Sequence, residues 1–170
     1  MCRWLPPVLA LMLVGCASHD VNARTADLGG DARACPSIRS AVLARDKSAL
    51  TVLDILCTGD LVVIAGALPP DYTLAVAAVH IARNTPGVGR VETFFVPRSE
   101  REASDSVLAA RLRTAVAGSD GVAATDLAVV AGTVVVVGVV DDQAKADRLV
   151  ANLGAVPGVK GVKSFLQVKP

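Results

Sequence analysis

Aromatic side chains are scarce in this chain of 170 residues: one tryptophan, one tyrosine and three phenylalanines amount to 3% of it. Hydrophobic residues nevertheless make up 52% of the sequence, and most of them are alanine, valine and other aliphatic residues. Small aliphatic side chains suit short strands and closely packed helices. The composition therefore indicates compact folded domains whose cores contain few rings.

An excess of charge of either sign is also missing. The sequence has 17 basic and 16 acidic residues, for a formal net charge of +1. A protein that binds nucleic acid through phosphate contacts normally carries a clear basic excess. We therefore expect no nucleic-acid partner.

Histidine occurs only twice, and neither copy has partners for metal or acid–base chemistry. His19 follows a serine and precedes Asp20 in a polar stretch without further ligands at a metal-binding spacing. His80 lies between two aliphatic residues of a predicted helix, and no nucleophile with an orienting acid can be assigned to it. Gly87–Gly89 precedes a strand, so it is not a phosphate loop. We expect no catalytic residues, no metal and no cofactor.

No apolar run near the start is long enough to span a bilayer. Arg3 precedes an apolar stretch of about ten residues, Leu5–Val14, which is typical of an export signal. The stretch ends in Leu13-Val14-Gly15-Cys16, a pattern that resembles the lipobox of bacterial lipoproteins. The alternative is an ordinary secretory signal with an incidental cysteine.

A lipobox predicts that the mature chain begins at Cys16 and carries a thioether-linked diacylglycerol with palmitate-type acyl chains. Each buried methylene contributes about 0.8 kcal/mol, so two or three chains hold a protein on a membrane almost permanently. Ala17 occupies the place where lipoproteins retained in the inner membrane usually have aspartate. Similarity to such proteins implies the outer membrane, with the protein facing the periplasm.

The chain uses one segment twice. Pro86–Val96 and Pro157–Val168 both begin with Pro-Gly-Val and continue into a strand with valine, serine or threonine, and phenylalanine at matching places. Upstream, Gly59–Gly66 matches Gly132–Gly138. The whole repeated unit is as long as a small domain, whereas the units of solenoid proteins are shorter. The repeat therefore indicates a duplicated domain. The predicted order is a signal at 1–15, a tether at 16–34, a first domain at 35–97, a linker at 98–104 and a second domain at 105–170.

Hydrophobic periodicity predicts the same element order in both copies. In copy one we expect a helix capped by Ser37, strands at 50–57 and 61–68, a helix at 71–84 and a strand at 91–96. In copy two we expect a helix at 105–117, strands at 125–130 and 133–140, a helix from Asp141 to Gly154 and a strand at 159–168. This is an α+β protein with two tandem αββαβ domains, each a three-stranded mixed sheet with two helices.

The run Val134–Val137 lacks the alternation of a half-buried strand. Either it is the middle strand of its sheet, or the neighbouring copy covers one of its faces. Since the helices are expected to cover one face of each sheet, the other face or an edge is available to the partner domain.

Two cysteines, Cys35 and Cys57, remain in the predicted mature chain. An exported protein enters an oxidising compartment, and the start of the first helix should lie near the end of the first strand. A disulfide closing this loop contributes about 3 kcal/mol in the chain-entropy model. The alternative is a pair of buried free thiols.

The pattern of glycines and aliphatic residues resembles the BON domain of periplasmic proteins, over about 35–97 and 104–168. Copy two is closer to it, through residues Gly132, Gly138, Gly158, Val159 and Val162. The resemblance implies an αββαβ fold without catalysis and a role in envelope integrity, with envelope stress as its setting. It also implies binding of anionic phospholipid, mainly by the second domain.

The first helix of copy two carries the residues that we predict to bind lipid: Leu108, Arg111, Leu112 and Arg113. Each basic residue near an anionic surface contributes about 1 kcal/mol. The alternative for these arginines is a solvated helix face. A different kind of partner also remains open, namely an envelope protein or peptidoglycan bound through a sheet surface, with lipid contacted only by the acyl anchor.

Overall fold

The computed structural model describes residues 34–101, 103–117 and 122–169, and the predicted export signal, Cys16 and tether lie outside these ranges. The first half consists of α1 (Ala34–Arg45), β1 (Leu53–Thr58), β2 (Leu61–Leu68), α2 (Thr73–Arg83) and β3 (Arg90–Pro97). The second half consists of α3 (Asp105–Ala117), β4 (Val122–Val130), β5 (Thr133–Val140), α4 (Gln143–Gly154) and β6 (Gly161–Val168). Short 3-10 helices cover Ala49–Thr51 and Arg98–Glu100. Both halves have the predicted αββαβ order, and the α+β class is confirmed.

Each half contains one mixed three-stranded sheet. In the first, β1 pairs antiparallel with β2, and β2 pairs parallel with β3. The second repeats this pattern with β4, β5 and β6. The strand orders β1-β2-β3 and β4-β5-β6 place β2 and β5 in the middle. A parallel pair needs a crossover connection, and α2 and α4 supply it.

The second helix of each half packs on its sheet through three small or aliphatic residues at helical spacing. These are Ala75, Ala78 and Ala82 in α2, and Ala146, Leu149 and Leu153 in α4. Asp142 caps α4, because its side chain accepts a hydrogen bond from the backbone N–H of Lys145 at 2.7 Å. The expected cap at Ser37 is wrong, because α1 already begins at Ala34 and Ser37 lies within its first turn.

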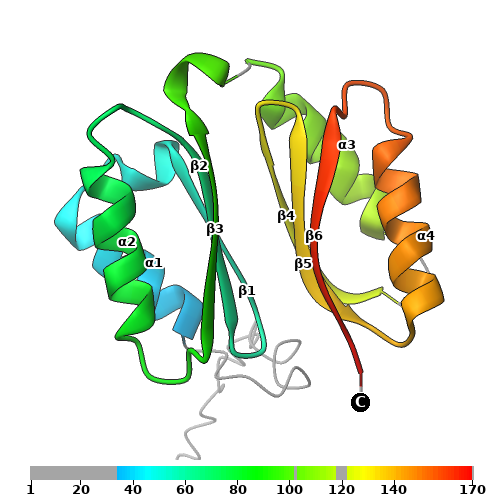
Figure 1. Cartoon of the computed structure of the whole chain (residues 1–170), viewed down its shortest axis with the longest axis horizontal. Coiled ribbons are helices and arrows are strands. Elements are labelled where there is room, and N and C mark those ends of the chain that lie inside the picture. The colour runs from blue at the N-terminus through cyan, green and yellow to red at the C-terminus, as the bar shows by residue number, and fades with distance from the viewer. Residues whose placement is uncertain (1–33, 102, 118–121, 170) are drawn as a thin grey trace, which may run out of the picture.

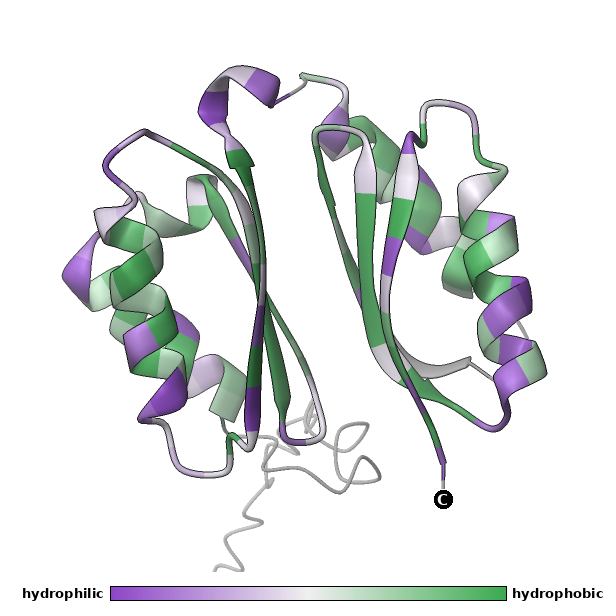
Figure 2. Ribbon diagram, in the orientation of Figure 1, coloured by the Kyte–Doolittle hydropathy of each residue, from purple (hydrophilic) through white to green (hydrophobic). Residues whose placement is uncertain are grey.

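The two sheets face each other, and the helices cover the outer faces (Figure 1). An inter-sheet core joins β1 and β2 to β4 and β5, and its fully buried members are Leu56, Leu61, Val63, Ala65, Ala67, Ala128, Val130, Val135 and Val137. Apolar residues dominate the middle strands, whereas the helices and the strands β3 and β6 carry both polar and apolar residues (Figure 2). Each half also has its own core between sheet and helices.

This arrangement explains the unbroken valine run of β5. Val134 and Val136 point into the core beneath α3 and α4. Val135 and Val137 point the other way, into the inter-sheet core. The strand is therefore both the middle of its sheet and covered by the other copy. Among the described helices, none is long and apolar enough to cross a membrane.

Candidate functional site

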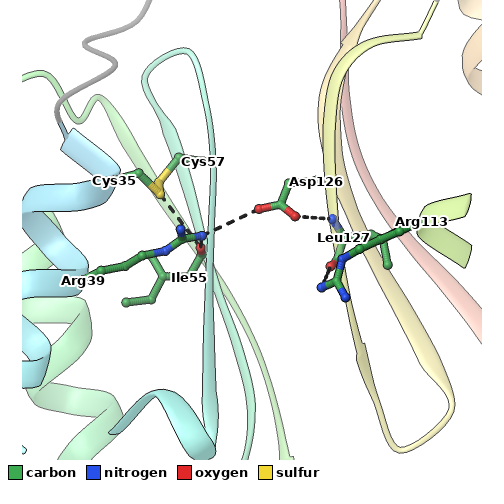
Figure 3. A network of polar contacts seen from close by, with 7 residues as sticks. All are labelled: Cys35, Arg39, Ile55, Cys57, Arg113, Asp126 and Leu127. Atoms are coloured by element: carbon green, nitrogen blue, oxygen red, sulfur yellow. Dashed lines mark hydrogen bonds and ion pairs between the residues drawn. A yellow bond between two sulfur atoms is a disulfide. The ribbon is translucent and has the colours of Figure 1, made fainter. Parts of the chain in front are cut away.

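Cys35 and Cys57 form a disulfide between the first turn of α1 and the end of β1 (Figure 3). Their Cα atoms are 6.0 Å apart, and 22 positions separate them along the chain. The bond ties α1 to its sheet close to the other half of the molecule. The second half has no cysteine, so only the first carries this covalent link.

Two arginines occupy equivalent places in the two halves. Arg39 directly follows the core residue Ile38 of α1, and its Nη2 donates a hydrogen bond to the carbonyl of Ile55 at 2.6 Å. Arg113 directly follows a core leucine of α3, and its Nη2 donates to the carbonyl of Leu127 at 3.0 Å. Ile55 and Leu127 each lie three residues before the end of the first strand of their half. The duplication has therefore kept this helix-to-strand bond.

Each of these arginines is also close to an aspartate of the other half. Arg39 forms an ion pair with Asp126 at 3.7 Å across the inter-domain gap (Figure 3). The equivalent of Asp126 in the first half is Asp54. Desolvation raises the pKa of Asp54, while the positive charge of Arg113 opposes this shift most strongly. The charges thus face each other in a crosswise pattern that favours one relative placement of the halves.

Asp54 and Arg113 line a polar notch of about 200 Å³ between the two sheets, together with Arg101 from the linker. Arg101 donates a hydrogen bond to the carbonyl of Thr51. Within the described part of the chain, no group of three or more histidine, cysteine, aspartate or glutamate side chains is placed to hold a metal ion. Residues of both halves line the notch, so it lies at the boundary between the two domains.

Asp105 has a structural role that sequence reasoning missed. The side chain is only 6% exposed, and its two carboxylate oxygens accept hydrogen bonds from the backbone N–H groups of Ala131 and Gly132, each at 2.9 Å. Ala131 has a positive φ of 53°, which is uncommon for a residue with a Cβ atom. Asp105 therefore holds the β4–β5 turn against the start of α3. An acidic residue at a helix start does not by itself indicate such a contact.

The four residues predicted to bind lipid do not form one surface. Leu108 is 6% exposed and Leu112 is completely buried, and both pack in the core of the second half. Arg113 turns toward the inter-domain notch. Arg111 and Arg113 are both exposed, but Arg111 is not among the residues that line the notch. Its neighbour one turn earlier, Val107, is 60% exposed and was not among the predicted residues.

Most of the basic residues near the C-terminus are engaged. Lys145 and Lys169 both pair with Asp141, the latter at 3.0 Å. Lys163 lies 6.0 Å from the centre of the Phe165 ring, in the range of a cation–π contact. Part of the positive charge near the C-terminus is therefore paired with Asp141.

Residues 104–170 match the family model of the BON domain, so the second half of the chain contains a BON domain. A search of curated proteins found no match. Two solved structures of CdsD, a structural protein of the type III secretion system of Chlamydia trachomatis, are similar to the chain. One, its C-terminal domain, has 16% identity and a TM-score of 0.33, and the match covers 82% of this chain and 67% of that one. The other has 17% identity and a TM-score of 0.34, with 82% and 64% covered.

Proposed function

We propose that this protein is a non-enzymatic lipoprotein of the bacterial envelope whose BON domain at residues 104–170 binds anionic phospholipid. Cys16 is its lipid anchor, and the two folded halves face the periplasm from the outer membrane. The first half, which repeats the αββαβ order of the second, is proposed to be a second BON domain. Its role is to support the lipid-binding half by packing against it.

The observation that carries this proposal is the outer side of α3. Val107 is 60% exposed there and lies one helical turn from the exposed Arg111. The only acidic residue of α3 is Asp105, which is buried and bound to the β4–β5 turn. An apolar residue beside a cation, without an exposed carboxylate on the same helix, suits the boundary between headgroups and acyl chains.

The buried residues of α3 contribute indirectly. Leu108 and Leu112 hold the helix on the sheet, so that Val107 and Arg111 are presented on a rigid element. A contact of two side chains is weak by itself. An anchor at Cys16 would raise its effective concentration at the bilayer, which makes a weak headgroup contact sufficient.

Co-sedimentation with vesicles tests this function. Both halves lie between Ala34 and Val168, so a form containing residues 17–170 keeps the whole fold without the anchor. We expect it to bind vesicles of anionic phospholipid at low salt and to lose binding at high salt or on zwitterionic vesicles. Arg111→Glu changes the charge by two units, and at about 1 kcal/mol for each it should weaken binding roughly tenfold or more.

A matched control separates this surface from net charge. Arg45→Glu makes the same charge change at the exposed end of α1 in the other half, and it should leave vesicle binding nearly unchanged. Val107→Asp should weaken binding as Arg111→Glu does. The proposal is wrong if 17–170 binds no vesicle under any condition, or if Arg45→Glu and Arg111→Glu weaken binding equally.

The second candidate function is an interaction module for an envelope protein or peptidoglycan, in which only the acyl anchor contacts lipid. The expectation that such a partner binds through a sheet face does not fit the fold, because the inner faces bury each other and helices cover the outer ones. A partner can still bind at the edge of a sheet. One such edge, in the first half, lies beside a groove.

A further inference from the structure

A groove of about 460 Å³ runs along the first half between α2 and β3. Its lining residues are Tyr72, Ala75, Val76, Val79, His80, Arg83, Asn84, Thr93 and Phe95. Alanine, valine and phenylalanine account for four of the nine lining residues, Tyr72 adds a further ring, and no carboxylate is among them. The proposed phospholipid contact on α3 uses none of these residues.

The outer rim of this groove exposes large apolar side chains. Val76 in the first turn of α2 is 67% exposed, and Tyr72, which immediately precedes the helix, is 45% exposed. Tyr72 also has a left-handed backbone conformation with a φ of 48°, which is strained for a residue with a bulky side chain. Phe95 lies half-buried on the strand side. An exposed aromatic held by a strained backbone next to an apolar groove is typical of an interaction site.

The duplication provides an internal comparison. Matching the Pro-Gly-Val turns at Pro86 and Pro157 pairs Tyr72 with Gln143 and Val76 with Asp147. In the second half these two residues are polar, and the side-chain amide of Gln143 donates a hydrogen bond to Asp147 at 2.8 Å. The buried residues of the two helices keep their apolar character, as Ala75 and Ala146 do. The apolar rim is therefore not a requirement of the fold.

The strand beside the groove is an edge strand. β3 pairs with β2 on one side, and within the described residues no strand pairs with its other side. Edge strands are usually protected by charges, prolines or bulges. In β3 these features lie toward the ends, at Arg90, Glu92 and Pro97, whereas the segment Thr93–Val96 has none. An unprotected edge next to an apolar groove can accept a further strand.

We infer that this groove binds an extended segment of a partner protein, which pairs its backbone with the free edge of β3. Because side chains alternate along a strand, every second side chain of the segment points into the groove, and these are apolar. Arg83 is the one permanently charged lining residue, so the segment carries an acidic residue or a terminal carboxylate at that end. Because the proposed function places the chain in the bacterial envelope, the partner is proposed to be an envelope protein, and this binding is independent of phospholipid.

Selection of displayed random octapeptides on the form 17–170 tests the inference. The critical variant, Tyr72→Gln with Val76→Asp, installs the pair that α4 carries at the equivalent places, so it should fold. We expect enriched peptides with alternating apolar residues that bind this variant at least tenfold more weakly. Arg83→Ala should weaken the binding of those peptides that carry an acidic end. Gln143→Ala with Asp147→Ala, the matched change on α4, should have no effect.

Tyrosine fluorescence gives a readout at the groove itself. Tyr72 is the only tyrosine of the chain, and the only tryptophan, Trp4, is absent from 17–170. Binding of a selected peptide that lacks tyrosine and tryptophan should change this emission. The inference is overturned if no peptide depends on Tyr72 and Val76. It is equally overturned if vesicles with brominated acyl chains quench Tyr72, which would make the groove a membrane contact.

Discussion

Several charged side chains of this protein bond to its own backbone. Asp105 bonds the amides of a turn, and Arg113 bonds a strand carbonyl while it faces the other half. Hydrogen bonds to charged groups contribute about 1.5–3 kcal/mol each. In the sequence such residues look like ordinary surface charges. The residues adjacent to them along the chain do not show which distant groups their carboxylate or guanidinium contacts in the folded protein.

The clearest prediction at this scale concerns Asp54 and pH. Desolvation raises the pKa of its carboxyl group above the ordinary value of 3.8, against the opposing charge of Arg113. The folded state therefore binds this proton more tightly than the unfolded state does. Its contribution to stability falls as the pH rises from about 3.8 through the raised pKa. Asp54→Asn should increase the free energy of unfolding at pH 7 and have little effect below pH 3.8.

Urea denaturation at both pH values measures this effect. Asp46→Asn is the matched control, because hydrogen bonds from the side chain and backbone of Ser48 lower the pKa of Asp46. The charged form of the Asp46 carboxylate stabilises the folded state. Asp46→Asn should therefore not increase the free energy of unfolding at pH 7. A loss of stability at pH 7 in Asp54→Asn would contradict the proposed origin of the shift.

At the scale of elements, the duplication keeps contacts that the αββαβ unit needs and varies those that it does not. Both first helices keep the arginine-to-carbonyl bond to the first strand. The disulfide is found in the first half alone, and the apolar rim of α2 has a polar counterpart on α4. The elements that differ are candidates for separate roles of the two halves.

The repeated glycines of the second strands give a test at this scale. A Cβ atom at Gly66 would lie 2.2 Å from the carbonyl oxygen of Val52, and one at Gly138 would lie 2.3 Å from the Thr125 side chain. A Cβ atom at Gly161 would meet nothing within 4 Å. Gly66→Ala should therefore cost about 1–3 kcal/mol, because backbone must shift to relieve the overlap.

Thermal or urea unfolding of both alanine variants provides the measurement. Gly161→Ala, also in a strand, should stay within about 0.5 kcal/mol of the parent protein. Equal stability of Gly66→Ala and Gly161→Ala would mean that β2 and the segment before β1 approach each other less closely than described here.

At the scale of the whole molecule, the central feature is the core between the two sheets. The middle strand β2 is buried at every position, because one face lies under the helices and the other under the second half. Polar contacts at the margin of this inter-sheet core contribute less to the stability of the molecule. The Arg39–Asp126 pair is 45% and 43% exposed, and exposed pairs contribute about 0.2–1 kcal/mol.

Two leucines of β1 test whether the halves stay packed in solution. Leu53 is 1% exposed and lies in the core of the first half, whereas Leu56 is 3% exposed and lies in the inter-sheet core. If the sheets remain together, Leu56→Ala and Leu53→Ala should both cost about 2–5 kcal/mol in urea unfolding. A cost below about 1 kcal/mol for Leu56→Ala alone would show that the halves separate readily.

Sequence reasoning was most successful where a local pattern causes the structure. The hairpins, the helix periodicity and the duplicated turns are properties of neighbouring residues, so the αββαβ order was predicted in both copies. It was least successful at the surface of α3. Leu108 and Leu112 belong to the apolar stripe of an amphipathic helix, and such a stripe looks the same whether it faces a membrane or the protein core.

The sequence by itself determined the two α+β units and the unbroken burial of Val134–Val137, because secondary structure follows from periodicity and turn chemistry over a few residues. Only the tertiary structure decided that the inner sheet faces bury each other, that Asp54 and Asp126 face the arginines of the opposite half, and that Tyr72 and Val76 remain exposed. These outcomes depend on which surfaces meet across long sequence separations. No local pattern specifies that choice.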